Sequence, residues 1–171
     1  ILDAQEVPLD FHAQISAKKK LYRYDIYNSP FADAFSFKFS KLIPYFLNVS
    51  SMKIASQYFL GTHDFSAFRS SSCEARTTVR TIYKIDLSQQ FLGNNKNRTN
   101  KLSFTPCRIT IEVEGNGFLK NMVRNIVGTL IEVGREKLVP EDIKKILTSR
   151  DRKNAGPTAA SHGLFLVKVF Y

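Results

Sequence analysis

The sequence predicts an α+β domain, with a largely antiparallel sheet and helices packed on one of its faces. Segments whose apolar residues alternate, as in strands, are interspersed with segments whose apolar residues recur three and four positions apart, as in helices. The strand segments follow one another at spacings that are typical of hairpins. Neither a repeat nor a linker divides the chain, and 171 residues with 43% hydrophobic side chains can bury a core. We therefore expect a single domain over residues 1–171.

The first expected strand covers residues 21–27. Tyr22, Tyr24 and Ile26 fall on one of its faces, and the residues between them fall on the other. An Asn-Ser-Pro turn at residues 28–30 ends it.

A helix is expected over residues 50–60. Ser50 or Ser51 can cap its N-terminus, and Gly61 can end it. One face carries an apolar stripe made of Met52, Ala55, Tyr58 and Phe59.

Two further strands are expected over residues 77–87 and 108–114. The polar residues 88–102 between them predict a loop. The core-facing residues would be Val79, Thr81, Tyr83, Ile85 and Leu87 in the first strand, and Ile109, Ile111 and Val113 in the second.

The most regular helical pattern follows a Gly-Asn-Gly turn. Apolar residues recur at helical spacing from Phe118 to Ile131, and Gly134 is the expected end. Pro140 opens another expected helix, which runs to about residue 149. Residues 163–171 are apolar on both faces, which predicts a central strand.

The charge balance points to an anionic partner. The chain has 25 Lys and Arg against 15 Asp and Glu, a formal charge of +10. Nucleic acid is the first candidate partner and a membrane surface the second, whereas a basic surface that serves only solubility is the alternative. The excess is greatest over residues 61–110, with 8 basic and 3 acidic residues, where we expect contact with RNA or DNA.

Cysteines and histidines are few. Cys73, Cys107 and three scattered histidines provide neither a disulfide framework nor a structural metal site. No apolar run is long enough to predict a transmembrane helix, and the first residues do not resemble a signal peptide. A cytoplasmic location fits this composition. Because the chain does not begin with Met, we expect a fragment or a processed chain.

Several polar residues are candidates for chemistry. His63 and Asp64 place an acid beside a base, although Asp64 could equally cap a turn. Arg69, Arg76 and Arg80 flank a Ser-rich turn, where guanidinium groups suit phosphate oxygens. The alternative is a solvated basic rim.

Arg124 lies at the margin of an apolar helix face. Such a residue has a carboxylate or phosphate partner, or it extends its charge to solvent. Tyr22 and Tyr24 follow three lysines that end at Lys20, and aromatic rings beside positive charge suit an extruded base. Ordinary aromatic packing in a sheet is the alternative.

Segments spread over nearly the whole chain together resemble the TruA-type tRNA pseudouridine synthases. The most specific is a Met-Val-Arg-Asn-Ile-Val-Gly run in a helix after a Gly-Phe-Leu turn. The segments, in order, are Asp10-Phe11-His12-Ala13, Tyr22-Arg23-Tyr24, Gly61-Thr62-His63-Asp64-Phe65-Ser66-Ala67-Phe68-Arg69, Arg76-Thr77, Gly117-Phe118-Leu119, Met122-Val123-Arg124-Asn125-Ile126-Val127-Gly128 and Gly163-Leu164-Phe165-Leu166.

The resemblance implies a pseudouridine synthase-like catalytic half. The activity it implies is isomerisation of uridine to pseudouridine in the anticodon stem-loop of tRNA. The uracil is detached from ribose C1′, rotated and rejoined through C5. The resemblance further implies no metal or organic cofactor, a homodimer as the complete enzyme, and no membrane partner.

Site residues can be carried over at matching positions. Tyr22 matches the active-site tyrosine, which stacks on the target base and helps to remove a proton. Arg124 matches the arginine that pairs with the nucleophilic aspartate, and Leu164 resembles the apolar wall of the uracil pocket. His63 and Asp64 fall within a motif that is structural or faces RNA. The expected RNA-binding residues are Lys20, Arg69, Arg76 and Arg80.

The chain departs from the family pattern at two places. None of its eight aspartates lies in the Gly-Arg-Thr-Asp type of motif that holds the nucleophile, and Gln14 stands where the family has Arg. We therefore expect the C-terminal half of an enzyme, inactive alone, with the N-terminal half and its catalytic Asp not present. The alternatives are a noncatalytic RNA-binding module, a degenerate paralogue, and a structural half that serves dimerisation.

Overall fold

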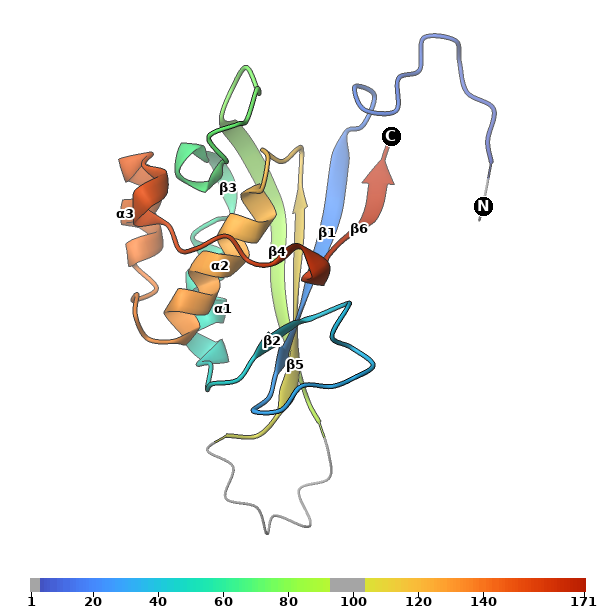
Figure 1. Ribbon diagram of the computed structural model, residues 1–171. Coiled ribbons are helices and arrows are strands. Elements are labelled where there is room, and N and C mark those ends of the chain that lie inside the picture. The colour runs from blue at the N-terminus through green and yellow to red at the C-terminus, as the bar shows by residue number, and fades with distance from the viewer. Residues whose placement is uncertain (1–3, 93–103) are drawn as a thin grey trace.

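The computed structural model describes residues 4–92 and 104–171. Its strands form one six-stranded sheet in the order β2-β1-β5-β4-β3, with β6 paired to β1. Helices α1, α2 and α3 lie together on one side of this sheet (Figure 1). Every strand pair is antiparallel except β1 with β2. The expected α+β architecture is therefore confirmed.

Strand β1 (Lys19–Asn28) lies at the centre of the sheet. It pairs with β5 (Cys107–Gly115) along its whole length. On the other side of β1, β2 (Lys41–Ile43) pairs with the last residues of β1. On that same side, β6 (Leu164–Phe170) pairs with the first residues of β1. Tyr24 and Ile26 are fully buried and Tyr22 packs against the core, as their alternation predicts.

Strands β4 (Val79–Phe91) and β3 (Gly61–Asp64) complete the other edge. The core-facing set predicted for β4 is partly wrong. The register with β5 shifts between Ile82 and Lys84, which leaves Tyr83 as an extra residue. Ile82 is consequently buried and Tyr83 is 53% exposed. Because such a bulge exchanges the two faces of a strand, the alternation cannot be extended through it.

The predicted start of the loop after β4, at residue 88, is wrong. Residues 88–91 continue the strand instead of starting the predicted loop, and they pair with β5. The remainder of that loop, from residue 93, lies outside the described residues. In β5, Ile109, Ile111 and Val113 are fully buried, so this alternation is confirmed.

Helix α1 (Val49–Gln57) buries Met52 and Ala55 of the predicted stripe fully. In the turn that follows the helix, Phe59 is also fully buried and Tyr58 is partly buried. Both predicted boundaries are wrong. The cap is Asn48, whose Oδ1 accepts a hydrogen bond from the Ser51 N–H at 3.1 Å. Gly61 opens β3, with a positive φ of 93°, and does not end the helix.

Helix α2 (Met122–Gly134) crosses the sheet and is buried along nearly its whole length. It begins later than predicted, because residues 118 and 119 are not helical and a turn follows at residues 120–121, where Asn121 has a left-handed φ of 63°. Phe118 is thereby directed onto Tyr22 of β1. The predicted end at Gly134 is confirmed.

Helix α3 (Asp142–Ser149) confirms the helix expected after Pro140. Strand β6, by contrast, is not central, because in the described part of the chain it pairs with β1 alone. Leu166 and Val167 are 53% and 47% exposed. A strand's own residue pattern reports which faces are apolar and does not report whether both backbone edges are paired.

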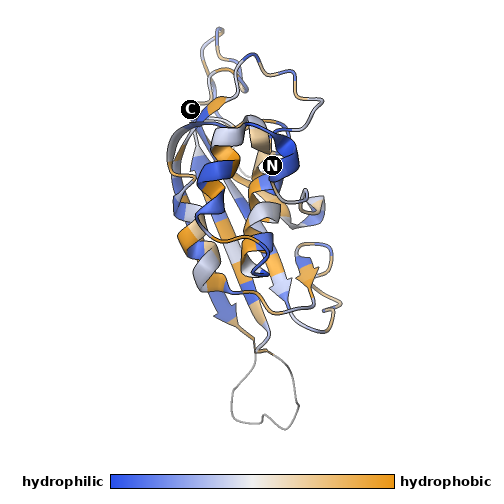
Figure 2. Cartoon of the chain, turned by 90° about the vertical axis from the view of Figure 1, so that its left-hand side faces the viewer, coloured by the Kyte–Doolittle hydropathy of each residue, from blue (hydrophilic) through white to orange (hydrophobic). Residues whose placement is uncertain are grey.

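The core fills the space between the helices and the sheet. Figure 2 looks onto the helices with the sheet behind them, and apolar residues alternate with polar ones along the strands. The fully buried large side chains come from both layers; they include Tyr24, Phe59, Phe65, Phe68, Met52, Met122, Ile109, Ile111 and Leu130.

Candidate functional site

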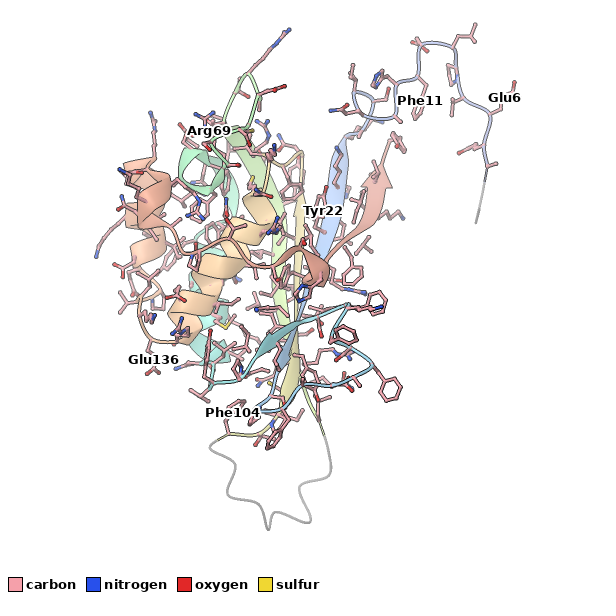
Figure 3. The ribbon with its side chains drawn as sticks, viewed as in Figure 1. Glu6, Phe11, Tyr22, Arg69, Phe104 and Glu136 are labelled. Carbon is pink, nitrogen blue, oxygen red and sulfur yellow. The ribbon has the colours of Figure 1, made fainter. Side chains whose placement is uncertain are left out.

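Three of the residues singled out from the sequence meet in one pocket. Tyr22, Arg124 and Leu164 line a cavity of about 260 Å³, hereafter the Tyr22 pocket. It lies between β1, the turn before α2 and the start of β6 (Figure 3). Its remaining lining residues are Phe118, Leu119, Lys120, Asn121, Met122 and Val123. Residues more than a hundred positions apart in the sequence thus surround one space.

Tyr22 is half-buried and held by an aromatic contact. Its ring meets that of Phe118 edge to face, with centroids 5.1 Å apart and an angle of 84° between the rings. Burial raises the pKa of the Tyr22 hydroxyl above its ordinary value. At neutral pH the hydroxyl is therefore protonated, so it can donate a hydrogen bond but is a poor base.

Arg124 is anchored by neutral oxygen atoms. Its Nε donates to the carbonyl oxygen of Ala159 at 2.6 Å, and its Nη1 donates to Oδ1 of Asn121 at 3.1 Å. No carboxylate of residues 4–92 or 104–171 forms an ion pair with it. The guanidinium is fixed at the pocket wall, and its pairing with an aspartate stays a prediction.

Tyr24 lies in the core, within reach of the Arg124 charge. Burial raises the pKa of Tyr24 to about 12, although the Arg124 charge acts in the opposite direction. Its hydroxyl donates to the carbonyl oxygen of Ala160 at 2.7 Å. Tyr24 therefore fits the alternative of ordinary aromatic packing in the core. Tyr22 borders a pocket, so stacking on an extruded base stays a prediction for Tyr22 alone.

A close helix contact positions the wall of the pocket. A Cβ atom on Gly128 of α2 would lie 1.7 Å from the carbonyl oxygen of Pro157, so only glycine fits there. A Cβ atom on Gly156 would likewise lie too close to backbone, 2.7 Å from Cα of Thr129. This contact holds the segment that includes Ala159 against α2, where its N–H donates to the Arg124 carbonyl oxygen at 3.1 Å.

Asp64 is a turn residue outside the Tyr22 pocket. Its Oδ1 accepts hydrogen bonds from the N–H and the hydroxyl of Ser66, and its Oδ2 pairs with Arg150 Nε at 3.2 Å. Burial alone would raise the pKa of the Asp64 carboxyl, but hydrogen bonds from Ser66 and Thr78, with the Arg150 charge, lower it overall. His63 Nε2 contacts the carbonyl oxygen of Leu60 at 2.7 Å. These contacts support the turn-capping alternative.

The four expected RNA-binding residues come from different segments of the fold. Arg80 donates through Nη1 to the carbonyl oxygens of Thr77 and Val79. Arg76 is exposed, and Lys20 lies on β1 between β5 and β6. Arg69 lines a second, larger pocket beside the start of α2 (Figure 3). Whether any of the four binds RNA stays a prediction.

Comparison with known proteins identifies the family. A sequence model of one protein family, described as tRNA pseudouridine synthase, matches residues 55–171. The chain belongs to the tRNA pseudouridine synthase family. The match runs from the last residues of α1 through β6 and includes Arg124 and Leu164 of the Tyr22 pocket.

Individual relatives agree with this assignment. The tRNA pseudouridine synthase A of Acetivibrio thermocellus is 47% identical over 171 residues, which is 100% of this chain and 64% of the relative. That of Ruminiclostridium cellulolyticum is 45% identical over 171 residues, again 100% of this chain and 64% of the relative. The chain therefore spans less than two thirds of the length of these tRNA pseudouridine synthases.

Sequence reasoning missed several residues of the site. The apolar pattern predicts a helix that includes Phe118, and neither Asn121 nor Ala159 is among the residues predicted for the site. Asn is among the residues that tolerate a left-handed backbone, so an Asn between the Gly-Phe-Leu turn and the helix was a usable signal for Asn121. The carbonyl oxygen of Ala159 carries no such signal, because every residue type has one.

Within residues 4–92 and 104–171, no group of three or more His, Cys, Asp or Glu side chains could hold a metal ion. None of the helices in that part of the chain is long and apolar enough to cross a bilayer.

Proposed function

We propose that the complete protein converts uridine to pseudouridine in the anticodon stem-loop of tRNA, with the target base bound in the Tyr22 pocket. The observation that carries the proposal is the meeting of Tyr22, Arg124 and Leu164 in one cavity. Membership of the tRNA pseudouridine synthase family supports the reaction class.

The reaction exchanges one glycosidic bond for another. The bond between C1′ of the ribose and N1 of the uracil breaks, the base turns, and a bond forms between C1′ and C5. The proton on C5 is lost and N1 gains one, so the atoms balance without an oxidant or reductant. A base flipped out of its stack needs an aromatic partner and a shaped apolar pocket. The Tyr22 ring and the Leu164 side chain meet these needs.

Arg124 is the residue suited to hold a nucleophilic carboxylate. A guanidinium has five N–H donors, and the contacts with Ala159 and Asn121 use two of them. Its charge has no carboxylate partner among the described residues, and a partly buried charge is stabilised by a counter-ion. We place the nucleophilic aspartate opposite Arg124 and outside these 171 residues, in a Gly-Arg-Thr-Asp type of motif.

Tritium release tests this proposal. tRNA carrying tritium at uridine C5 is incubated with the complete protein and, separately, with the chain of residues 1–171. The complete protein should release tritium, and the 171-residue chain should release no more than a control without enzyme. Release by the short chain alone would contradict the placement of the nucleophile. Binding of tRNA by the complete protein without any release would favour a noncatalytic RNA-binding module.

A further inference from the structure

A second pocket, larger than the Tyr22 pocket, adjoins it. It has a volume of about 520 Å³ and is bounded by η1 (Ser66–Phe68), the start of α2, and the segment that contains η3 (Arg152–Asn154). Asn121 lines both pockets, so they meet at the turn that precedes α2. We call it the Arg152 pocket. It is lined by Ser66, Arg69, Ser70, Ser71, Asn121, Asn125, Arg150, Asp151, Arg152 and Thr158.

Arg152 is held in place by neutral partners. Its Nη2 donates to Oδ1 of Asn125 and to Oγ1 of Thr158, each at 3.2 Å, and its Nη1 donates to the carbonyl oxygen of Ala155 at 3.1 Å. Asn125 is fully buried and is fixed in turn, because its Nδ2 donates to the carbonyl oxygen of Phe68 at 2.7 Å. The Arg152 guanidinium is therefore preorganised. These hydrogen bonds use three of its five N–H groups and leave two for other acceptors.

The pocket carries an excess of positive charge. Arg69 and Arg152 form no ion pair with a carboxylate in residues 4–92 or 104–171. Arg150 pairs with Asp64, but its side chain is 69% exposed. Asp151 is the acidic lining residue, and its Oδ1 accepts the N–H of Lys153 at 2.9 Å. Three guanidinium groups thus outnumber Asp64 and Asp151 together.

Hydroxyl groups add to the donors. Ser70 and Ser71 line the same space, whereas the Ser66 hydroxyl, which also lines it, already donates to Asp64. The Ser70 N–H donates to the carbonyl oxygen of Lys120 at 3.0 Å. This bond ties the Ser-rich turn to the residues that precede α2. Paired guanidinium N–H groups and nearby hydroxyls match the geometry of a phosphate group.

We propose that the Arg152 pocket binds a backbone phosphate of the tRNA close to the nucleotide whose base enters the Tyr22 pocket. The inference rests on the proposed function, because Asn121 joins this pocket to the proposed base site. Preorganised arginines beside that site would fix the register of the RNA backbone, and so position the flipped base without reading its sequence.

The salt dependence of tRNA binding tests the proposal. Arg69→Gln and Arg152→Gln each remove one guanidinium from the complete protein, and Lys53→Gln removes one exposed charge from α1 as the matched control. Each pocket variant should weaken tRNA binding about tenfold at physiological salt. Each should also make the slope of log affinity against log salt shallower by about one. Lys53→Gln should change neither quantity appreciably.

The outcomes separate this inference from the proposed function. If both pocket variants bind tRNA as Lys53→Gln does, the phosphate site is wrong, whereas tritium release by the unmodified protein would still support the proposed reaction. Weaker binding with an unchanged salt slope would also overturn the phosphate site. If Arg152→Gln fails to fold, by its thermal unfolding curve, Arg69→Gln alone decides, because Arg69 forms no ion pair within the described residues.

Discussion

Tyr22 and Arg124 occupy the same pocket but are held there by different forces. Tyr22 is fixed by packing, since its ring and that of Phe118 meet edge to face. Arg124 is fixed by hydrogen bonds to oxygens that carry no formal charge. Truncation of Tyr22 should therefore remove a contact surface, and truncation of Arg124 should remove an unneutralised charge. These two kinds of loss can be distinguished by measurement.

Replacing Tyr22 separates turnover from binding. In the complete protein, Tyr22→Ala should lower kcat by roughly 10- to 100-fold, because base–aromatic stacking contributes about 1–3 kcal/mol. The tRNA dissociation constant should change much less, since most of the binding energy comes from phosphate contacts elsewhere. Steady-state kinetics and direct tRNA binding measure the two effects. Tyr83→Ala, at an exposed position of β4, is the control, and equal losses of kcat and affinity in Tyr22→Ala would contradict a local stacking role.

The buried hydroxyl of Tyr24 should make stability sensitive to alkaline pH. The unfolded chain loses the Tyr24 proton near pH 10, whereas the folded chain keeps it until about pH 12. The resulting stabilisation is complete below pH 10 and is lost as pH rises toward 12. By pH 11 the loss relative to pH 7 should be about 1 kcal/mol. Urea unfolding should show a smaller alkaline loss in Tyr24→Phe than in the unmodified protein, and no such difference in Tyr83→Phe.

At the scale of elements, the contact between α2 and residues 155–160 builds the site. Gly128 and Gly156 allow two backbones to approach closely, and the approach places the Ala159 carbonyl oxygen within reach of Arg124. Leu164 follows a few residues later, at the start of β6. The pocket wall therefore depends on two residues that have no side chain.

A methyl group at Gly128 should disrupt that contact. Gly128→Ala should destabilise the protein by about 3 kcal/mol, because its Cβ would overlap the Pro157 carbonyl oxygen and the neighbouring backbone must move. Gly117→Ala is the matched control, since a Cβ there meets only the Arg80 side chain at ordinary contact distance. Thermal or urea unfolding measures both variants. If Gly128→Ala and Gly117→Ala had the same free energy of unfolding, packing of residues 155–160 against α2 would not require glycine at position 128.

Several elements were predictable from the sequence, and others were not, for physical reasons. The α2 and β5 patterns were clear because these elements are buried on the faces that their residues define. The faces of β4 were partly wrong because the bulge at Tyr83 has no apolar signature. The edge position of β6 depends on backbone pairing that its apolar side chains do not encode. The residue pattern already marks Tyr22 and Arg124 as candidates, and the family resemblance adds their roles and Leu164, whereas Arg152 needs the fold to bring it beside Arg69.

At the scale of the whole molecule, the charge of +10 favours a polyanion. Arginines line both pockets, with Arg124 in one and Arg69, Arg150 and Arg152 in the other. Binding to tRNA should therefore release several counterions and weaken steeply as salt rises. Affinity measured between 50 mM and 200 mM salt should fall by about 10³-fold if six phosphates are contacted. An affinity that does not change over this range would contradict a basic tRNA-binding surface.

Photocrosslinking of the substrate tests most directly whether the target uridine enters the Tyr22 pocket. tRNA containing 5-bromouridine is irradiated with the complete protein, and the modified peptides are mapped by mass spectrometry. Bromine at C5 replaces the hydrogen whose loss completes the proposed reaction, so the base should remain in the pocket. We expect the adduct on Tyr22 or Phe118, and we expect its loss in Tyr22→Ala. Adducts confined to residues outside the Tyr22 pocket would contradict the assignment.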